Sequence, residues 1–424
     1  MESRTPDTLT GAPGGTVRRV AGWWAREQAA LAARPGRVAA AVRWLAVRPA
    51  VVLLPPAAIS PGLFGAAVPD GDGSWFREAG LSMLGPGLLE VFSASGLQIG
   101  PLYLLLVGLL AAAADLVGLP VLFTVAAVQS AGLAAYALHL SARWARELGA
   151  DPLRARWGVV APLVLLGPLA ESIGNGHPEE LLLGLMLAHL VLLVRRGRAT
   201  PAGVVLGLMV GLKLWGVLAA PLVLLARRRR VLVVVAAWTV VLGAGAYLPF
   251  ALAGELNTFE FSWGARVAPF GVELQGALLE GWGFRVVQAA VVASLVALVA
   301  WRWPGTGLGA ALTLVAVRVV LDPLLQMYYT IPFVALALVW VWTAPSAGGR
   351  WTLASWPLVL CSMLGPYLLP TTPKLALTHA AMLAVAVAVV RADHRWVTAR
   401  RPGGGPAASG GHAWRPRQEQ ATTS

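Results

Sequence analysis

Charge, lysine and cysteine are all scarce in this sequence. Only 12% of its 424 residues are charged, against 57% that are hydrophobic, which excludes an ordinary soluble globular protein. Several apolar runs approach the roughly 20 residues that a helix needs to cross a bilayer, so we expect a polytopic membrane protein. The single cysteine, Cys361, lies in an apolar run, and the sequence therefore offers neither a disulfide nor a cysteine-based metal site.

Positive charge comes almost entirely from arginine. The sequence has 33 basic and 20 acidic residues, a formal charge of +13, and its lysines are Lys213 and Lys374. The arginines cluster at the borders of apolar segments, which predicts contact with an anionic cytoplasmic leaflet. Nucleic-acid binding is a weaker interpretation because these clusters form no continuous basic domain. The N-terminal region is polar and basic and lacks the short apolar core of a cleavable signal peptide.

These patterns predict an all-α transmembrane bundle of about 11 crossings. We expect residues 1–48 to form a disordered and interfacial cytoplasmic segment, residues 49–395 the transmembrane domain, and residues 396–424 a disordered basic tail. The positive-inside rule places both termini in the cytoplasm, and we expect a multi-pass protein of the plasma (inner) membrane. No internal repeat with a period of about 20–50 residues is apparent.

Two apolar segments do not fit single crossings of ordinary length. Residues 101–118 are interpreted as an outer-surface or half-inserted helix, with the second true span at 121–141, because two full crossings there would leave an arginine cluster outside. Residues 200–226 have basic flanks at both ends, which predicts a hairpin of two short helices. Lys213 would lie at the tip of this hairpin, toward the outer face.

An acidic loop follows the first span, in the stretch 68–103. It carries Asp70 and Asp72 between glycines, followed by the aromatic residues Trp75 and Phe76 of an amphipathic segment. Both aspartates are ordinary turn formers, and Asp72 is also placed to act as the N-cap of the following helix. A carboxylate at a bilayer surface can also accept a proton from a sugar hydroxyl, so we predict a catalytic base here.

A polar turn after the third span contains Asn175, His177, Glu179 and Glu180. The two glutamates are well placed to stabilise the N-terminus of the next helix, which is a purely structural role. One histidine and two carboxylates can also bind a metal, but they lack a recognised ligand spacing, so we expect no resident metal, although a divalent cation is not excluded.

Two cations in apolar surroundings complete the set of candidate residues. Lys213 is the single charge between residues 200 and 226, and a lysine at the outer leaflet suits a phosphate, although snorkelling to the interface is the simpler role. Arg318 lies four residues before Asp322, which predicts an ion pair on one helix face. A guanidinium also binds two phosphate oxygens at once. Polar side chains follow at the same depth: Gln326, Tyr328 and Tyr329.

Together these residues resemble the GT-C glycosyltransferase superfamily. The resemblance lies in the acidic first outer loop with its following aromatics, and in residues 165–230, where a span, a polar turn, a span, a basic turn and a lysine-containing apolar hairpin follow one another. The sequence is most similar to bacterial polyprenyl-phosphate-mannose-dependent mannosyltransferases of the α-1,2 type, over roughly residues 50–345. It departs from them at Gly176-His177 and at the Gly100-Pro101-Leu102-Tyr103 return.

The resemblance implies sugar transfer, with mannose as the expected sugar, from a polyprenyl-phosphate donor to a glycolipid or cell-envelope glycan at the outer face. It implies Asp72 as the base, with Asp70 as the second candidate, and Lys213 and Arg318 at the donor phosphate. It also implies Asp322, Tyr328 and Tyr329 as substrate-binding residues. From the residues themselves we add His177, Asn175, Glu179 and Gln326 to the side chains expected to bind substrate. No cofactor besides the lipid-linked donor is implied.

Two other classes of protein share this topology. A transporter or flippase of lipid-linked substrates predicts paired charges within spans and symmetry between halves, whereas here the charges gather at one face. A catalytically silent scaffold for envelope assembly is the other alternative.

Overall fold

The computed structural model describes residues 30, 36–67, 71–93, 96–254, 256–258, 282–322, 326–369 and 371–399. Within these ranges the regular structure is helical, apart from an isolated antiparallel bridge between Ile99 and Lys213. The all-α prediction is therefore confirmed for this part of the protein. Asp70 lies outside the described residues, and so do most of residues 253–284, which the sequence predicts to form a second outer loop.

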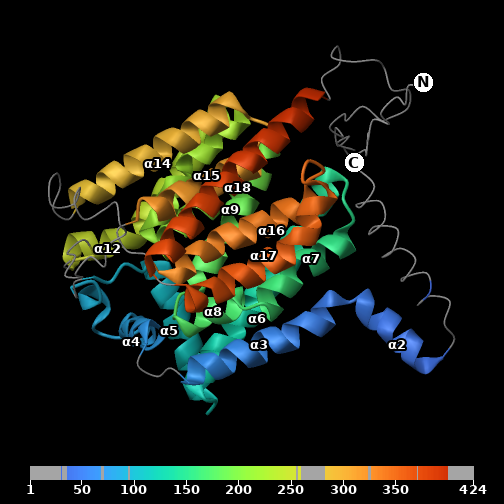
Figure 1. Ribbon diagram of the computed structural model, residues 1–424. Coiled ribbons are helices and arrows are strands. Elements are labelled where there is room, and N and C mark those ends of the chain that lie inside the picture. The colour runs from blue at the N-terminus through green and yellow to red at the C-terminus, as the bar shows by residue number, and fades with distance from the viewer. Residues whose placement is uncertain are drawn as a thin grey trace, which may run out of the picture.

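The N-terminal helices lead from the expected interfacial segment to the acidic loop (Figure 1). Helix α2 and the first part of α3 meet at an angle of 75°, and α3 contains three internal prolines. The indole of Trp157 donates to the carbonyl of Ala46 at 2.8 Å, which holds the end of α2 against α7. In chain order these elements are α2 Arg37–Ala46, α3 Pro49–Ala67, α4 Asp72–Ser82, η1 Leu88–Glu90, α5 Pro101–Leu116 and α6 Val121–Leu148.

The rest of the bundle, from α7 to α18, consists of helices of very different lengths. Asp151 caps α7 by accepting from the backbone N–H of Leu153, and α6 ends at Gly149 with φ of +73°, a conformation that glycine adopts without strain. The remaining elements are α7 Pro152–Leu165, α8 Pro168–Gly174, α9 Pro178–Arg195, α10 Ala199–Leu212, η2 Leu214–Ala226, α11 Arg229–Thr239, η3 Val240–Ala244, α12 Gly245–Ala253, α14 Trp282–Arg302, α15 Gly307–Val320, η4 Met327–Thr330, α16 Ile331–Thr343, α17 Gly348–Leu368 and α18 Thr371–Ala399.

Helix α9 lies at the centre of this bundle. It is apolar on all sides, and nearly all of its residues are buried against α6, α10, α15, α16 and η2. A helix without a polar face must be surrounded by other helices or lipid, so its sequence alone favours this central place. Two adjacent glutamates at its N-terminus are thereby buried as well.

Polar turns gather at the two ends of the bundle. At one end, the break at Lys213 meets Ile99, and the turn at Gly176 meets Gly73 of α4. At the other end, Arg196 pairs with Glu147 and Arg227 donates to the carbonyl of Trp301. The arginine-rich turns therefore lie far from the acidic loop, as the charge pattern predicts for opposite faces of a membrane.

Several expected boundaries agree with the structure, and others need correction. The helix break at Lys213 is confirmed, since α10 ends at Leu212 and η2 begins at Leu214. The third span, which precedes the polar turn at Asn175, is instead bent by 44° between α7 and α8. Helix α18 runs from Thr371 to Ala399, past the expected boundary at residue 395.

Four helices in the described part are long and apolar enough to cross a membrane, or up to six if each bent pair forms one span. These four are Val121–Leu148, Arg229–Ala253, Arg285–Arg302 and Ala376–Ala399. The described part also contains shorter apolar helices, among them α5 and α10, which are too short to be counted among these spans. About 11 crossings therefore stays a prediction.

Candidate active site

The N-terminus of α9 places two carboxylates inside the protein. Pro178 occupies the first helical position, and Glu179 and Glu180 follow in the first turn, where the helix dipole favours negative charge. Both side chains are 0% exposed. Buried carboxylates are tolerated only with charged or hydrogen-bonding partners, so the surrounding residues must supply cations.

Lys213 supplies the first of these cations. It follows the last residue of α10, in extended conformation, and its Nζ lies 2.8 Å from Oε1 of Glu179 and 2.8 Å from Oε1 of Glu180. The break is held by the bridge to Ile99 and by the backbone N–H of Gly100, which donates to the carbonyl of Leu212. The unwound backbone therefore brings the ammonium group to the end of α9.

His177 joins the buried glutamates to the acidic loop. Its Nδ1 lies 2.7 Å from Oε1 of Glu179, and its Nε2 lies 3.0 Å from Oδ2 of Asp72. The ring stacks on Tyr328 at a centroid distance of 4.0 Å and meets the edge of Phe76. Burial opposes the charged form of His177, but the carboxylates of Glu179 and Asp72 outweigh burial and the nearby Lys213, so the pKa of His177 is raised above its ordinary value.

Asp72 is the member of this group that remains open to solvent. Its side chain is 46% exposed, whereas that of His177 is 7% exposed. The structure corrects its expected role as an N-cap: Gly71 is the N-cap, and Asp72 is the first residue of α4. Its carboxylate is thus held by His177 through one oxygen and stays accessible, which is the arrangement a general base needs.

Two glycines allow the acidic loop to approach the His177 turn this closely. Gly176 has φ of +74°, and a Cβ added there would lie 2.3 Å from the backbone nitrogen of Gly73. Any side chain at position 176 must therefore strain the backbone and push the Asp72 loop away from His177.

We expect Gly176→Ala to lower the sugar-transfer activity that the sequence resemblance implies by roughly 10- to 100-fold, because a displacement of about 1 Å is enough for such a loss. Initial rates and the melting temperature of the variant test this. Gly132→Ala is the matched control, since a Cβ there meets nothing within 4 Å. Full activity of a folded Gly176→Ala variant would show that the close approach of the two turns is dispensable.

Arg318 is a second buried cation next to Glu180, in addition to Lys213. Its Nη2 lies 3.5 Å from Oε1 of Glu180 and 3.9 Å from Oδ2 of Asp322, and Asp322 also pairs with Arg285 at 3.1 Å. The expected ion pair between Arg318 and Asp322 is thus present. The guanidinium lies over the rings of Trp215 and Tyr329, at 4.2 and 4.8 Å from their centroids.

These contacts form one continuous charge network at the end of the bundle that holds α4. It alternates in sign, so with His177 charged its four carboxylates and four cations balance. Its members, in contact order, are Asp72, His177, Glu179, Lys213, Glu180, Arg318, Asp322 and Arg285.

Some polar atoms of the charge network have no hydrogen-bond partner within the described residues. They are Oε2 of Glu179, Oε2 of Glu180 and Nη1 of Arg318. A buried guanidinium nitrogen without a partner is costly, so Arg318 is better placed than Lys213 to take a further anionic group. Lys213 already has a carboxylate oxygen at 2.8 Å on two sides.

The other predicted site residues are not members of the charge network. Asn175 is exposed at the end of α8 and donates to the carbonyl of Glu171, and Gln326 is exposed before η4. Tyr329 is buried beside Tyr328, with the two rings at right angles.

From the sequence, Glu180 is expected only as a charge at a helix N-terminus or a metal ligand, and Arg285 and Trp215 are not assigned to the site. Glu180 receives bonds from both Lys213 and the indole of Trp215. The position of Glu180 in an otherwise apolar helix was the available signal, because a buried charge there demands a partner.

Residues 99–325 match glycosyltransferase family 87, and the match covers more than half of the sequence. The chain belongs to glycosyltransferase family 87. No curated protein matches it significantly. Family membership, with the apolar helices, makes it a membrane glycosyltransferase, in keeping with the predicted class of enzyme and not with a transporter.

The family 87 match includes most of the charge network but not all of it. His177, Glu180, Lys213 and Arg318 lie within the matched residues. Asp72 lies before them, and so does the segment that forms α4. The assignment of Asp72 as a base therefore depends on the geometry. His177, which lies within the matched residues, bonds to the Asp72 carboxylate.

Proposed function

We propose that this family 87 enzyme transfers mannose from a polyprenyl-phosphate donor to a lipid-linked or cell-envelope acceptor, with inversion, at the extracytoplasmic face. The observation that carries the proposal is the half-exposed carboxylate of Asp72, which the buried pair of His177 and Glu179 holds in place. The identities of sugar, donor and acceptor follow the sequence resemblance described above.

In the proposed reaction Asp72 accepts the proton of an acceptor hydroxyl. The hydroxyl oxygen then forms a bond to the anomeric carbon, and the bond from that carbon to the phosphate oxygen breaks. The phosphate leaves with the electron pair of the broken bond. A phosphate is already a good leaving group, so the protein supplies mainly orientation, one base and positive charge.

Positive charge for the departing phosphate is proposed to come from Arg318 and Lys213. Nη1 of Arg318 makes no hydrogen bond within the described residues, whereas Lys213 must exchange a carboxylate for phosphate. Tyr328 and Tyr329 lie next to this pair, because Tyr328 stacks on His177 and Tyr329 lies under Arg318.

An apolar cavity supports a lipid-linked substrate. It has a volume of about 350 Å³, lies between α16, α17 and α18, and begins at Met327 and Thr330, which flank the two tyrosines. It extends along α16 to Trp340 and Val341. A hydrocarbon chain in this cavity would have its head group at the charge network, which is the arrangement that a polyprenyl-phosphate donor requires.

The test is transfer by purified protein in nanodiscs, with radiolabelled polyprenyl-phosphate mannose and envelope lipid as substrates. We expect a radiolabelled glycolipid and the release of polyprenyl phosphate in equal amounts. Uptake of label into vesicles without a product would overturn the proposal in favour of transport. Absence of both product and uptake with every polyprenyl-phosphate sugar tried would overturn the donor assignment.

A further inference from the structure

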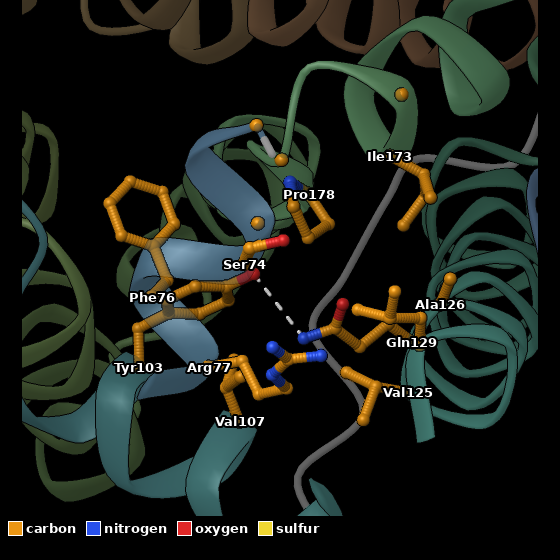
Figure 2. Close-up of a pocket in the computed structure, with 15 residues that line it drawn as sticks. Ser74, Phe76, Arg77, Tyr103, Val107, Val125, Ala126, Gln129, Ile173 and Pro178 are labelled. Atoms are coloured by element: carbon orange, nitrogen blue, oxygen red, sulfur yellow. Dashed lines mark hydrogen bonds between the residues drawn. The ribbon is translucent and has the colours of Figure 1, made fainter. Parts of the chain in front are cut away.

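A second cavity lies on the other side of the acidic loop, between α4, α5, α6 and α8. Figure 2 shows Arg77 of α4 and Gln129 of α6 pointing toward each other across it, with Ser74 and Tyr103 above them. Nε2 of Gln129 donates to the hydroxyl of Tyr103 at 3.3 Å. Apolar side chains, among them Val107 and Val125, form the remaining walls.

Among the described residues that line this cavity, Arg77 has no buried counter-ion, unlike the cations of the charge network. Its ion pair is with the adjacent Glu78, at 3.5 Å, and the Glu78 side chain is 70% exposed while that of Arg77 is 22% exposed. An ion pair at this distance with an exposed partner contributes little. The guanidinium therefore keeps most of its capacity to bind an anion.

Arg77 also lies on the same helix as the proposed base. It follows Asp72 by five residues on the same helix, which corresponds to about 7.5 Å along the axis. Gly73, Ser74 and Arg77 share the helix face that lines the cavity, while Asp72 bonds to His177. One acceptor molecule can thus contact Arg77 and present a hydroxyl to Asp72.

We propose that this cavity is the acceptor subsite and that Arg77 binds a phosphate group of an anionic lipid acceptor. The proposal rests on the proposed function of Asp72, which lies between this cavity and the donor side at Tyr328. A guanidinium binds two phosphate oxygens in parallel, and the Gln129 amide and the Tyr103 hydroxyl provide further polar contacts. The cavity has a volume of about 50 Å³, which suits a phosphate group alone, so the lipid attached to the phosphate would lie outside it.

Binding of an anionic lipid is measured separately from sugar transfer. Decyl phosphate is the anionic probe, and decyl maltoside is the neutral one. We expect the wild-type enzyme in nanodiscs to bind decyl phosphate, and Arg77→Gln to weaken this binding by roughly 10- to 100-fold, with a smaller loss for Arg77→Lys. Asp72→Asn should bind the probe normally. Unchanged affinity of Arg77→Gln would overturn the proposal even if transfer is observed.

Arg146→Gln is the matched control, because Arg146 is exposed near the opposite end of α6. Gln129→Leu provides a second variant of the same cavity in case Arg77→Gln does not fold, and weaker probe binding is again expected. In the transfer assay, Arg77→Gln should raise KM for the acceptor and leave KM for the donor unchanged. A raised donor KM with an unchanged acceptor KM would assign the phosphate to the donor and overturn the acceptor subsite.

Discussion

Asp72→Asn lowers transfer activity by about 100- to 10,000-fold in our expectation, which is the usual loss when a general base is removed. The change keeps the shape of the side chain and its capacity to accept a hydrogen bond from His177 Nε2, now 3.0 Å from Oδ2. It removes the negative charge that would take the acceptor proton. Melting temperature and donor affinity should therefore stay close to the wild-type values while the rate falls.

Initial rates with radiolabelled donor measure this effect. Glu78→Gln is the matched control, because Glu78 lies on the same helix and its side chain is 70% exposed. Asp70→Asn tests the second candidate, which lies outside the described residues. An active Asp72→Asn enzyme alongside an inactive Asp70→Asn enzyme would move the role of base to Asp70.

Lys213→Met is expected to destabilise the protein by about 3–5 kcal/mol, the usual cost of breaking a buried ion pair. Lys213 Nζ bridges Glu179 and Glu180, whose side chains are 0% exposed. Methionine keeps the length and apolar stem of lysine but leaves two adjacent carboxylates facing each other without the cation between them. The thermal unfolding midpoint in nanodiscs measures the loss.

Two further variants separate charge from packing at Lys213. Lys213→Met combined with Glu180→Gln should recover part of the lost stability, because one of the facing carboxylates becomes neutral. Arg196→Met is the control for a partly exposed pair, with Glu147 at 2.6 Å, and should cost no more than about 1 kcal/mol. Equal effects of Lys213→Met and Arg196→Met would contradict a central role for the charge network.

The sequence predicted helices well where apolarity and local signals agree. The apolar runs predicted an all-helical bundle, and the lysine within residues 200–226 marked the helix break between α10 and η2. The number of crossings was harder to predict, because short apolar helices such as α5 are compatible with either crossing or half-insertion. Hydropathy measures the apolarity of a segment and not its path.

The sequence by itself also selected Asp72 and His177, which lie in two polar turns, and Lys213 and Arg318, which lie in apolar segments. The two cations stood out because charges in apolar segments are costly unless they have a function or a partner. Apart from the pair of Arg318 with Asp322, which the spacing predicts, only the tertiary structure decided what each of them pairs with. Positions as far apart as 72 and 177, or 180 and 318, meet because α4 and α9 begin, and α15 ends, at the same side of the bundle. No periodicity in the sequence encodes that meeting.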